Sequence, residues 1–498
     1  MPTHHDRDEH VLLNDRTLAQ HAARLTVPTY DRSLVRVGIV HLGVGGFHRA
    51  HEALYVDRLL HEGSREWGIC GVGVLPTDRP MAAAMQAQDG LYTLVVKHPD
   101  GSRQARVVGS LVQYLFAPDE PEAVLAQLVD PLVKIVSLTI TEGGYGIDAV
   151  TGEFVSDDPA VRADLAPGAV PATAFGLIVE ALARRRAGGV PPFTVMSCDN
   201  IPGNGGVARH SVAAFAALRD PELGEWVRSE VRFPDSMVDR ITPVTTDEDR
   251  TDVARRYDVE DRWPVVCEPY LQWVLQDDFG LGRPAFERVG IQLVDNVQPY
   301  ELMKLRLLNA SHQALCYFGH LAGYRLVHEV CQDPLFVRFL SAYMAQEGAP
   351  TLPPVPGVDL ADYQLQLIER FANPQVRDTV ARLCADTSDR IPKWLLPVVR
   401  HQLRTGGPLA LSAAVVASWA RYAEGLDEQG EPITVVDRLA AQLTAAARRW
   451  PQDPLSFLRQ RELFGDLVDE PRFVAAYTTA LDGLHTRGAR AALADVLA

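Results

Sequence analysis

Three polar side chains of a largely apolar segment, residues 304–312, have types and a spacing that suit proton chemistry: Lys304, Asn309 and His312. On a helix advancing 100° per residue, Asn309 lies about 140° and His312 about 80° from Lys304, so all three share one wide face. Such a set suits alcohol oxidation, in which a base takes the hydroxyl proton while donors stabilise the developing alkoxide. A lysine acts as that base only where burial or a neighbouring cation lowers its pKa. The alternative is one exposed lysine and two structural polar residues on a long helix.

Two earlier segments place polar residues next to apolar runs. Asn200 follows the strand predicted at residues 193–197, and catalytic groups favour the carboxyl ends of such strands. Its amide could donate to an oxygen that gains charge, or could satisfy a turn. Asp239 and Arg240 interrupt the apolar residues 237–243, where ligand binding and a structural salt bridge explain them equally well.

A glycine-rich turn follows the β-branched run at residues 35–42. Gly43, Gly45 and Gly46 precede Phe47, which begins a helix-compatible segment. Glycines at this position let the backbone approach a pyrophosphate, and the first turn of the helix offers N–H groups to its charge. The standard G-x-G-x-x-G pattern has its third glycine where this sequence has His48, so a purely structural turn is the alternative.

Asp78 follows the second apolar run, residues 67–74, where an acidic side chain accepts the ribose hydroxyls of NAD. Arg79 beside it could instead pair with the extra phosphate of NADP, and a solvated surface role for Asp78 is the third possibility. We therefore predict NAD as the cofactor and leave NADP open.

His48 and His51 are three residues apart on the predicted helix, a spacing that metal ligands also use. Zinc needs further ligands, and no nearby cysteine or H-E-x-x-H sequence supplies them. We expect both histidines on the helix surface or in supporting positions, and we predict no metal.

The surrounding pattern predicts an α/β fold in two parts. Apolar β-branched runs alternate with helical segments in the first part, which is typical of βαβ units and of a Rossmann-type dinucleotide-binding domain. After about residue 300 the pattern is that of amphipathic helices. We place the domains at residues 1–295 and 296–498, with a hinge near 295–299 and a ligand cleft between them. The predicted strands are 35–42, 67–74, 92–97, 105–108, 135–140 and 193–197. The predicted helices include 47–62, 172–186, 304–321, 334–346, 360–371, 409–422, 436–450 and 472–487.

Composition narrows the class of protein. The chain has 498 residues, 47% hydrophobic and 22% charged, which indicates a folded globular protein of several domains. A net charge of -16 argues against nucleic acid as a partner. The longest apolar candidate, residues 410–420, is too short to cross a bilayer. Six scattered cysteines indicate buried reduced thiols, and the polar residues 1–10 do not resemble a secretory signal, so we expect a cytoplasmic protein.

Five motifs in this order resemble the polyol-specific long-chain dehydrogenases, the mannitol 2-dehydrogenase family. The resemblance runs from about residue 38 to at least residue 400, and His48 stands where that family also lacks the third glycine. The motifs are Gly43-x-Gly45-x-Phe47-His48-Arg49-Ala50-His51, Thr141-Glu142-Gly143-Gly144-Tyr145, Ser197-Cys198-Asp199-Asn200-Ile201, Met237-Val238-Asp239-Arg240-Ile241-Thr242-Pro243 and Lys304-x4-Asn309-x2-His312.

The resemblance implies a zinc-independent NAD(P)-linked oxidoreductase of CH–OH groups, with an N-terminal Rossmann domain, a helical C-terminal domain and an active site in the cleft between them. Lys304 resembles the general base of this family. Asn200 and Asn309 resemble the two donors that hold the reacting oxygen.

The same resemblance implies roles for four further residues. His312 resembles the residue that positions the substrate hydroxyl, Asp239 matches a substrate-contacting aspartate, and Arg382 corresponds to a substrate-binding arginine. Asp78 corresponds to the acidic residue that favours NAD. The resemblance also implies a monomer.

The resemblance implies a small polyol or ketose as the substrate, with D-mannitol and D-fructose favoured. The alternative within the family is a hexuronate reductase acting on fructuronate or tagaturonate, whose extra carboxylate Arg382, Arg390 or Lys393 could bind. Outside the family, the rival hypotheses are a sugar-phosphate dehydrogenase, for which no obvious cationic cluster is present, and a non-enzymatic sensor of dinucleotide redox state.

Overall fold

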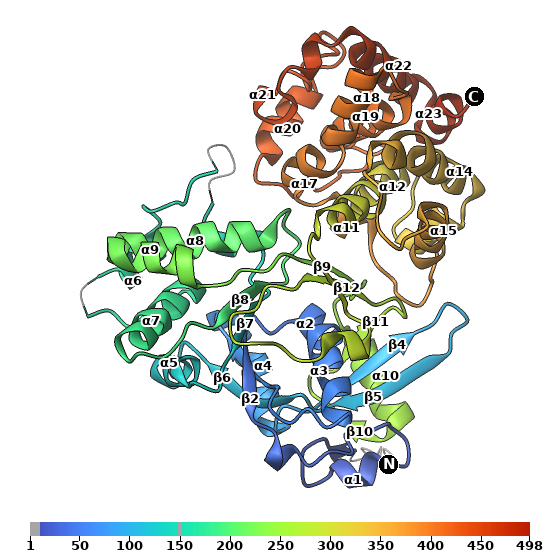
Figure 1. Ribbon diagram of the computed structural model, residues 1–498. Helices are drawn as coiled ribbons and strands as arrows, with labels where there is room; N and C mark the ends of the chain where they lie inside the picture. Colours follow the sequence, from blue (N-terminus) through green and yellow to red (C-terminus); the bar gives the residue numbers. More distant parts are fainter. Residues whose placement is uncertain (1–9, 148–151, 167) are drawn as a thin grey trace, which may run out of the picture. The chain divides into compact units, whose positions relative to one another are not determined.

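A computed structural model describes residues 10–147, 152–166 and 168–498, and the chain divides into two compact units, Met1–Val297 and Gln298–Ala498 (Figure 1). Residues 1–9, most of the polar start discussed above, lie outside the described part.

A parallel sheet of five strands forms the centre of the first unit, in the order β6-β3-β2-β7-β8. The strands are β2 (Val37–Leu42), β3 (Gly68–Gly73), β6 (Leu111–Phe116), β7 (Ile135–Leu138) and β8 (Thr194–Ser197). The chain passes from β2 to β3 on one side and returns later to β7 on the other. Ligands of such sheets bind where the strand order reverses, outside the carboxyl ends, which here is the end of β2.

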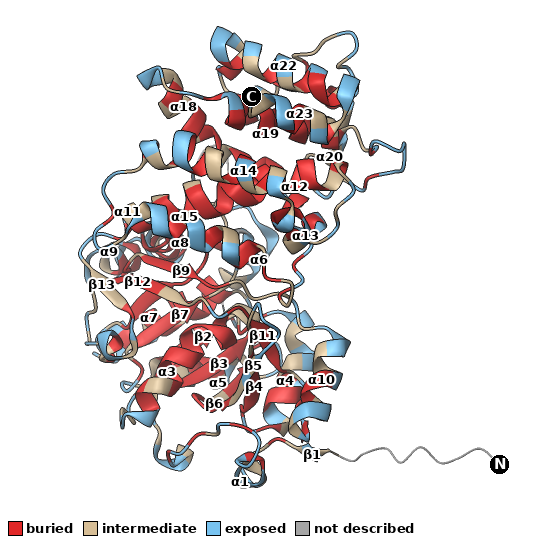
Figure 2. Ribbon diagram, turned by 90° about the vertical axis from the view of Figure 1, so that its right-hand side faces the viewer, coloured by how far each residue is buried: buried red, intermediate tan, exposed pale blue. Residues whose placement is uncertain are grey.

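Both faces of this sheet are covered, which explains why its strands are almost continuously apolar. Successive residues of β2 point to opposite faces: Ile39 packs with α3 and α4, whereas Val40 and Leu42 pack with α5, α7 and α8. The strands accordingly appear buried in Figure 2.

Helices of the first unit join and cover these strands. The α-helices are α1 (Leu18–His21), α2 (Gly46–Ala50), α3 (Glu52–His61), α4 (Arg79–Ala87), α5 (Pro121–Val129), α6 (Pro159–Asp164), α7 (Ala174–Ala187), α8 (Asn204–Arg219), α9 (Pro221–Glu230) and α10 (Asp247–Tyr257). Short 3₁₀ turns are η1 (Arg32–Leu34), η2 (Pro76–Asp78), η3 (Glu142–Tyr145) and η4 (Phe286–Val289). The helix predicted at 47–62 is broken at His51, whose backbone leaves the helical region at φ -123°, ψ -92°.

Three smaller sheets complete the unit, in the orders β11-β4-β5, β13-β12-β9 and β1-β10. Their strands are β1 (Val11–Leu12), β4 (Tyr92–Lys97), β5 (Arg103–Val108), β9 (Ser236–Asp239), β10 (Val259–Glu260), β11 (Val265–Cys267), β12 (Gln272–Gln276) and β13 (Gln292–Val294). The strands predicted at 92–97 and 105–108 therefore exist, but they pair with each other and not with the central sheet.

The second unit is helical, and two of its helical segments are π-helices, η5 and η6. Its first part comprises α11 (Gln298–Met303), η5 (Lys304–Asn309), α12 (Ala310–Leu321), α13 (Val327–Gln332), α14 (Pro334–Ala342), η6 (Tyr343–Gly348), the 3₁₀ turn η7 (Ala349–Thr351) and α15 (Leu360–Phe371). Its second part comprises α16 (Val380–Cys384), α17 (Thr387–Trp394), α18 (Leu396–Thr405), α19 (Ala410–Ala423), α20 (Ala440–Ala447), α21 (Arg461–Phe464), the 3₁₀ turn η8 (Leu467–Asp469), α22 (Pro471–Arg487) and α23 (Ala489–Val496).

Three predicted helices of this unit need correction. The helices expected at 304–321 and 334–346 are each partly π-helical, because backbone bonding shifts to i→i+5 over residues 304–309 and 343–348. The helix expected from residue 436 begins at Ala440, since Asp437 accepts hydrogen bonds from Ser388 and from the N–H of Leu439 in the preceding turn.

The fold class predicted from the sequence is confirmed: a Rossmann-type domain precedes a helical one. All six cysteines are buried and none forms a disulfide, as expected. Among the described residues, no helix combines the length and apolar character needed to cross a membrane.

Candidate active site

The glycine loop after β2 has one position that requires glycine and one that leaves open space. Gly43 has φ +89°, and a Cβ there would lie 2.4 Å from the carbonyl oxygen of Thr139. Gly45 is extended, and a Cβ there would meet only the Gly43 oxygen, at 3.9 Å. Gly46 begins α2, and Phe47 stacks on the His51 ring with centroids 4.8 Å apart. The backbone at Gly45 is therefore open to close approach by a ligand.

A hydrogen-bonded chain from β7 and β2 holds this loop. The Thr139 hydroxyl donates to the carbonyl of Gly43 at 2.7 Å, and it lies 2.9 Å from Nε2 of His41. The other ring nitrogen of His41, Nδ1, lies 2.8 Å from Oγ of Ser137. Since Thr139 gives its proton to Gly43, Nε2 of His41 is the donor to Thr139.

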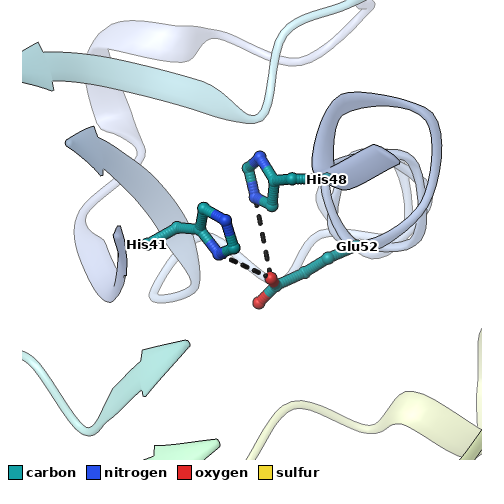
Figure 3. A group of neighbouring side chains, drawn as sticks. All are labelled: His41, His48 and Glu52. Carbon is teal, nitrogen blue, oxygen red and sulfur yellow. Dashed lines mark ion pairs between the residues drawn. The ribbon is translucent and has the colours of Figure 1, made fainter. Parts of the chain in front are cut away.

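His41 belongs to a buried cluster with His48 of α2 and Glu52 of α3 (Figure 3). Oε2 of Glu52 lies 3.1 Å from Nδ1 of His41 and 3.6 Å from Nε2 of His48. In the part of the chain that the structure describes, neither Glu52 oxygen and neither His48 nitrogen has a hydrogen-bond partner. Burial, followed by the positive potential of neighbouring His41, Arg49 and His51, lowers the pKa of His48 well below its usual value, so this ring is neutral at pH 7.

The ligand types in this cluster would suit a metal ion, but the ring geometry does not. The imidazoles of His41 and His48 stack with centroids 3.5 Å apart and an interplanar angle of 13°. A metal binds in the plane of an imidazole, at about 2.0–2.1 Å from nitrogen for zinc, and one ion cannot lie in two parallel stacked planes. The cluster instead supports the glycine loop, because His41 contacts Thr139 and Thr139 donates to the carbonyl of Gly43.

Of the two positions expected for His48 and His51, the helix surface is wrong, because both side chains are buried; a supporting position remains. Nε2 of His51 lies 2.9 Å from the carbonyl oxygen of Gln272, and this contact accompanies the break between α2 and α3. Sequence spacing did not show His41 as the partner of His48, because α2 must first fold back over β2.

Asp78 lies where the sequence predicted, in η2 just after β3. Its Oδ2 accepts the N–H groups of Val74 and Leu75 at 3.0 and 2.9 Å, which orient the carboxylate at this edge of the sheet. The neighbouring Arg79 makes two hydrogen bonds of 2.7 Å to the carboxylate of Asp119, and its guanidinium lies 4.8 Å from the centre of the Phe116 ring. Arg79 thus already has a carboxylate partner.

Asp199, part of the motif at residues 197–201, ties together the loops after β7 and β8. Its carboxylate accepts the N–H groups of Ile140 and Thr141 and the hydroxyl of Tyr145 at 2.8 Å. Burial is the largest influence on the carboxyl group and raises its pKa despite these hydrogen bonds. The next residue, Asn200, is exposed at the carboxyl end of β8.

Asn204 joins the Asn200 loop to β9, which ends at Asp239. The buried Asn204 amide donates to the carbonyls of Asp199 and Ser236 and accepts the Ser236 N–H. Asp239 is 4% exposed. Arg240 donates to the carbonyls of Ala50 and Glu268, so it has a structural role.

In the second unit, Lys304 opens the π-helix η5 and Asn309 closes it. The π pattern is visible in the bond from the Ala310 N–H to the carbonyl of Leu305, five residues earlier. In a regular α-helix, residues 304 and 309 would lie about 140° apart. An i→i+5 turn places the fifth residue nearly above the first, so Lys304 and Asn309 share a face more closely than the α-helical projection predicts.

His312 follows Asn309 by three residues in the regular helix α12, which keeps it on the same face. Asn309 is 4% and His312 is 9% exposed. The His312 ring packs against Phe371 with centroids 4.5 Å apart, which fixes its position beside Asn309.

Arg382, the predicted substrate arginine, lies on α16, and its guanidinium is paired with the carboxylate of Asp378, whose Oδ1 accepts from Nε at 2.6 Å. This carboxylate raises the pKa of Arg382 even though burial acts in the opposite direction. Arg390 donates to the carbonyls of Arg382 and Leu383 and lies 3.9 Å from Asp386.

Two family sequence patterns match the chain across both units. Residues 37–288 match the mannitol dehydrogenase Rossmann domain, and residues 296–485 match the mannitol dehydrogenase C-terminal domain. The chain belongs to the mannitol dehydrogenase family. A mannitol 2-dehydrogenase of Phaeosphaeria nodorum is 47% identical over 97% of this chain and 85% of its own length.

Solved structures of this family agree with that assignment. The Pseudomonas fluorescens mannitol 2-dehydrogenase, in a ternary complex with NAD and D-mannitol, matches with a TM-score of 0.90 and 44% identity, covering 98% of this chain and 99% of its own. A D-sorbitol dehydrogenase in substrate-free form gives 0.89 and 37%, covering 97% and 100%. Membership of the mannitol dehydrogenase family confirms the predicted resemblance and the prediction of an oxidoreductase of CH–OH groups.

Proposed function

We propose that the chain is an NAD-dependent polyol dehydrogenase that interconverts a sugar alcohol and a ketose, with D-mannitol and D-fructose as the favoured pair. The observation that carries this proposal is the shared face of Lys304, Asn309 and His312, in a chain 44% identical to an enzyme solved with NAD and D-mannitol.

The residues of the first unit fit a dinucleotide. Gly43 and Gly45 would hold the pyrophosphate segment, because the loop is fixed at Gly43 and open at Gly45. Asp78 would accept the ribose hydroxyls, since its carboxylate is oriented by two backbone N–H groups. Pairing of Arg79 with Asp119 leaves this arginine a weaker partner for a 2′-phosphate, which supports NAD over NADP. When bound, NAD takes up the hydrogen and the two electrons released at the alcohol carbon.

The second unit supplies the acid–base chemistry. In its uncharged form, Nζ of Lys304 takes the hydroxyl proton of the polyol, and the same group returns a proton in ketose reduction. The amides of Asn309 and Asn200 donate hydrogen bonds to the oxygen as it gains charge, and His312 positions the substrate hydroxyl. Asp239 and Arg382 contact the remaining hydroxyls. We propose that no metal takes part, which the stacked geometry of His41 and His48 supports.

A neutral polyol is a better substrate candidate than a uronate. A uronate carboxylate needs a cationic partner in the site. The Arg382 guanidinium already binds the carboxylate of Asp378, and Arg390 binds two carbonyls and lies near Asp386. Arg382 can bind a neutral hydroxyl through its remaining donors, whereas a substrate carboxylate would compete with Asp378 for the guanidinium. We also propose a monomer, which sedimentation of the purified protein tests.

NADH absorbance with purified protein tests the reaction. We expect consumption of NADH with fructose and its formation with mannitol and NAD, and little activity with fructuronate or tagaturonate. The reverse pattern would make the chain a hexuronate reductase, and no turnover with any of these compounds would favour the redox sensor.

Lys304→Ala tests the base. We expect kcat to fall about 10³-fold, within the range of general acid–base catalysis. Lys134→Ala is the matched control, because Lys134 is half-buried like Lys304 but lies at the amino end of β7, where it packs on Trp67. A Lys304→Ala enzyme within tenfold of the original kcat would show that the base assignment is wrong.

A further inference from the structure

The π-helix that carries Lys304 and Asn309 is held by a second π-helix of the same unit. We propose that Tyr343, which opens this second π-helix η6, is a positioning residue for catalysis: its hydroxyl holds η5 in the geometry that places Lys304 beneath Asn309. This inference rests on the proposed roles of Lys304 and Asn309.

The contact is made at the middle of η5. The Tyr343 hydroxyl donates to the carbonyl oxygen of Arg306 at 3.0 Å, and the Tyr343 side chain is fully buried. Burial raises the pKa of this phenol far above its ordinary value, so it stays a donor at every working pH. A π-turn disturbs the regular i→i+4 pairing of the helix, so an outside donor at one of its carbonyls offsets part of the cost.

Arg306 is also held through its side chain. The Arg306 guanidinium donates to the carbonyl and, at 3.0 Å, to the hydroxyl of Thr351 in η7. Thr351 in turn donates to the carbonyl of Gly348, at 2.6 Å, which closes η6. Arg306 is therefore bound through both its main chain and its side chain by the segment 343–351.

Close packing explains why this segment cannot shift easily. A Cβ at Gly348 would lie 3.0 Å from Cδ2 of Leu307 and 3.3 Å from the Arg306 oxygen, so the two π-helices are in tight contact. The segment is also anchored at its far side, because the buried Glu347 carboxylate accepts the N–H groups of Leu411 and Ser412, each at 2.8 Å. This support contacts η5 at Arg306 and Leu307, within the turn between Lys304 and Asn309.

The consequence concerns the relative rotation of two groups. If η5 relaxed to an α-helix, Asn309 would turn away from Lys304 toward the α-helical separation of about 140°. A displacement of about 1 Å in a catalytic group costs on the order of 100-fold in rate. The Tyr343 hydroxyl is buried against the Arg306 carbonyl, so its removal acts on kcat through Lys304 and Asn309.

Tyr343→Phe removes this hydroxyl and keeps the ring. We expect kcat for mannitol oxidation to fall at least tenfold, the lower apparent pKa of the kcat–pH profile to move, and the Kd for NADH, measured by fluorescence, to stay within twofold. Thr351→Val removes the hydroxyl that accepts from Arg306 and donates to Gly348 but keeps the carbonyl; it should lower kcat in the same direction and supplies a second perturbation if Tyr343→Phe folds poorly.

Tyr317→Phe is the matched control. Tyr317 is equally buried in the same unit, and its hydroxyl contacts Gln313 and Thr387, away from Arg306. We expect a similar change in Tm for both tyrosine variants but unchanged kcat for Tyr317→Phe. The proposal is overturned if Tyr343→Phe keeps kcat within twofold of the original enzyme, or if both variants lose activity in proportion to Tm. Full activity of Lys304→Ala would instead overturn the proposed base, and absence of turnover by the unchanged enzyme would overturn the proposed function, so these failures are distinguishable.

Discussion

Two single-methyl substitutions, Gly43→Ala and Gly45→Ala, test the glycine loop in opposite ways. At Gly43 the backbone has φ +89°, and the added Cβ would lie 2.4 Å from the carbonyl oxygen of Thr139. At Gly45 the backbone has φ -126°, which any residue adopts, and the nearest atom lies 3.9 Å from the added Cβ. Gly43→Ala should therefore lower the stability of the fold, whereas Gly45→Ala should weaken the binding of a ligand that occupies the open space.

The magnitudes follow from these geometries. Alanine in the left-handed region costs about 1–2 kcal/mol, and relief of the contact with Thr139 costs about 1–3 kcal/mol more. At about 2 °C per kcal/mol for a chain of this size, Gly43→Ala should lower Tm by roughly 4–10 °C. Gly45→Ala should leave Tm of the free protein within about 1 °C. It should raise the Kd for NADH at least tenfold, which is about 1.4 kcal/mol.

Thermal unfolding followed by circular dichroism, and fluorescence titration with NADH, measure both effects. An unchanged Tm for Gly43→Ala would refute the argument that this position requires glycine. Unchanged NADH affinity for Gly45→Ala would show that the dinucleotide does not use the open side of the loop.

Two further predictions concern Asp78 and His48. Asp78→Ala should raise the ratio of kcat/KM with NADP to kcat/KM with NAD at least tenfold, measured by initial rates; an unchanged ratio would remove Asp78 from cofactor recognition. Because burial lowers the pKa of His48, the unfolded chain binds more protons than the folded chain below about pH 6.5. The free energy of unfolding therefore decreases as the pH is lowered. This group should contribute a loss of about 1.4 kcal/mol at pH 5.5. Urea unfolding of His48→Gln at pH 7.5 and 5.5 should show a smaller loss than the original protein, and equal losses would contradict the assignment.

The central sheet could be predicted because its strands are buried on both faces. Residues such as Ile39 and Val40 belong to short, continuous apolar runs rich in β-branched residues. This pattern is typical of parallel strands that are buried on both faces. Strand β6 was not predicted, since Gln113 interrupts its apolar run. The short strands β9, β12 and β13 carry no comparable pattern, and their pairing depends on segments far apart in the chain.

The residue types of the candidate site could be proposed from the sequence, and their roles stay predictions, but their local geometry could not be predicted. Lys304, Asn309 and His312 stand out as polar residues in an apolar helix, which sequence spacing reveals. The π-turn between the first two depends on Tyr343, a contact that no spacing rule predicts. The cluster of His41 with His48 and Glu52 was missed for the same reason, since a strand and two helices must pack first.

The π-turn at Lys304–Asn309 also bears on how this sequence can change in length. A π-turn contains one residue more than the α-turn it replaces, so it behaves as a one-residue insertion within a helix. Deleting a single residue between Lys304 and Asn309 would restore a regular helix with an i,i+4 spacing, which would keep the two side chains about 40° apart on one face. Surface loops tolerate insertions and deletions far more readily. Here the π-turn accommodates the extra residue inside a helix, so an aligned relative with a one-residue gap at this point would be expected to keep both side chains on one face of a regular α-helix.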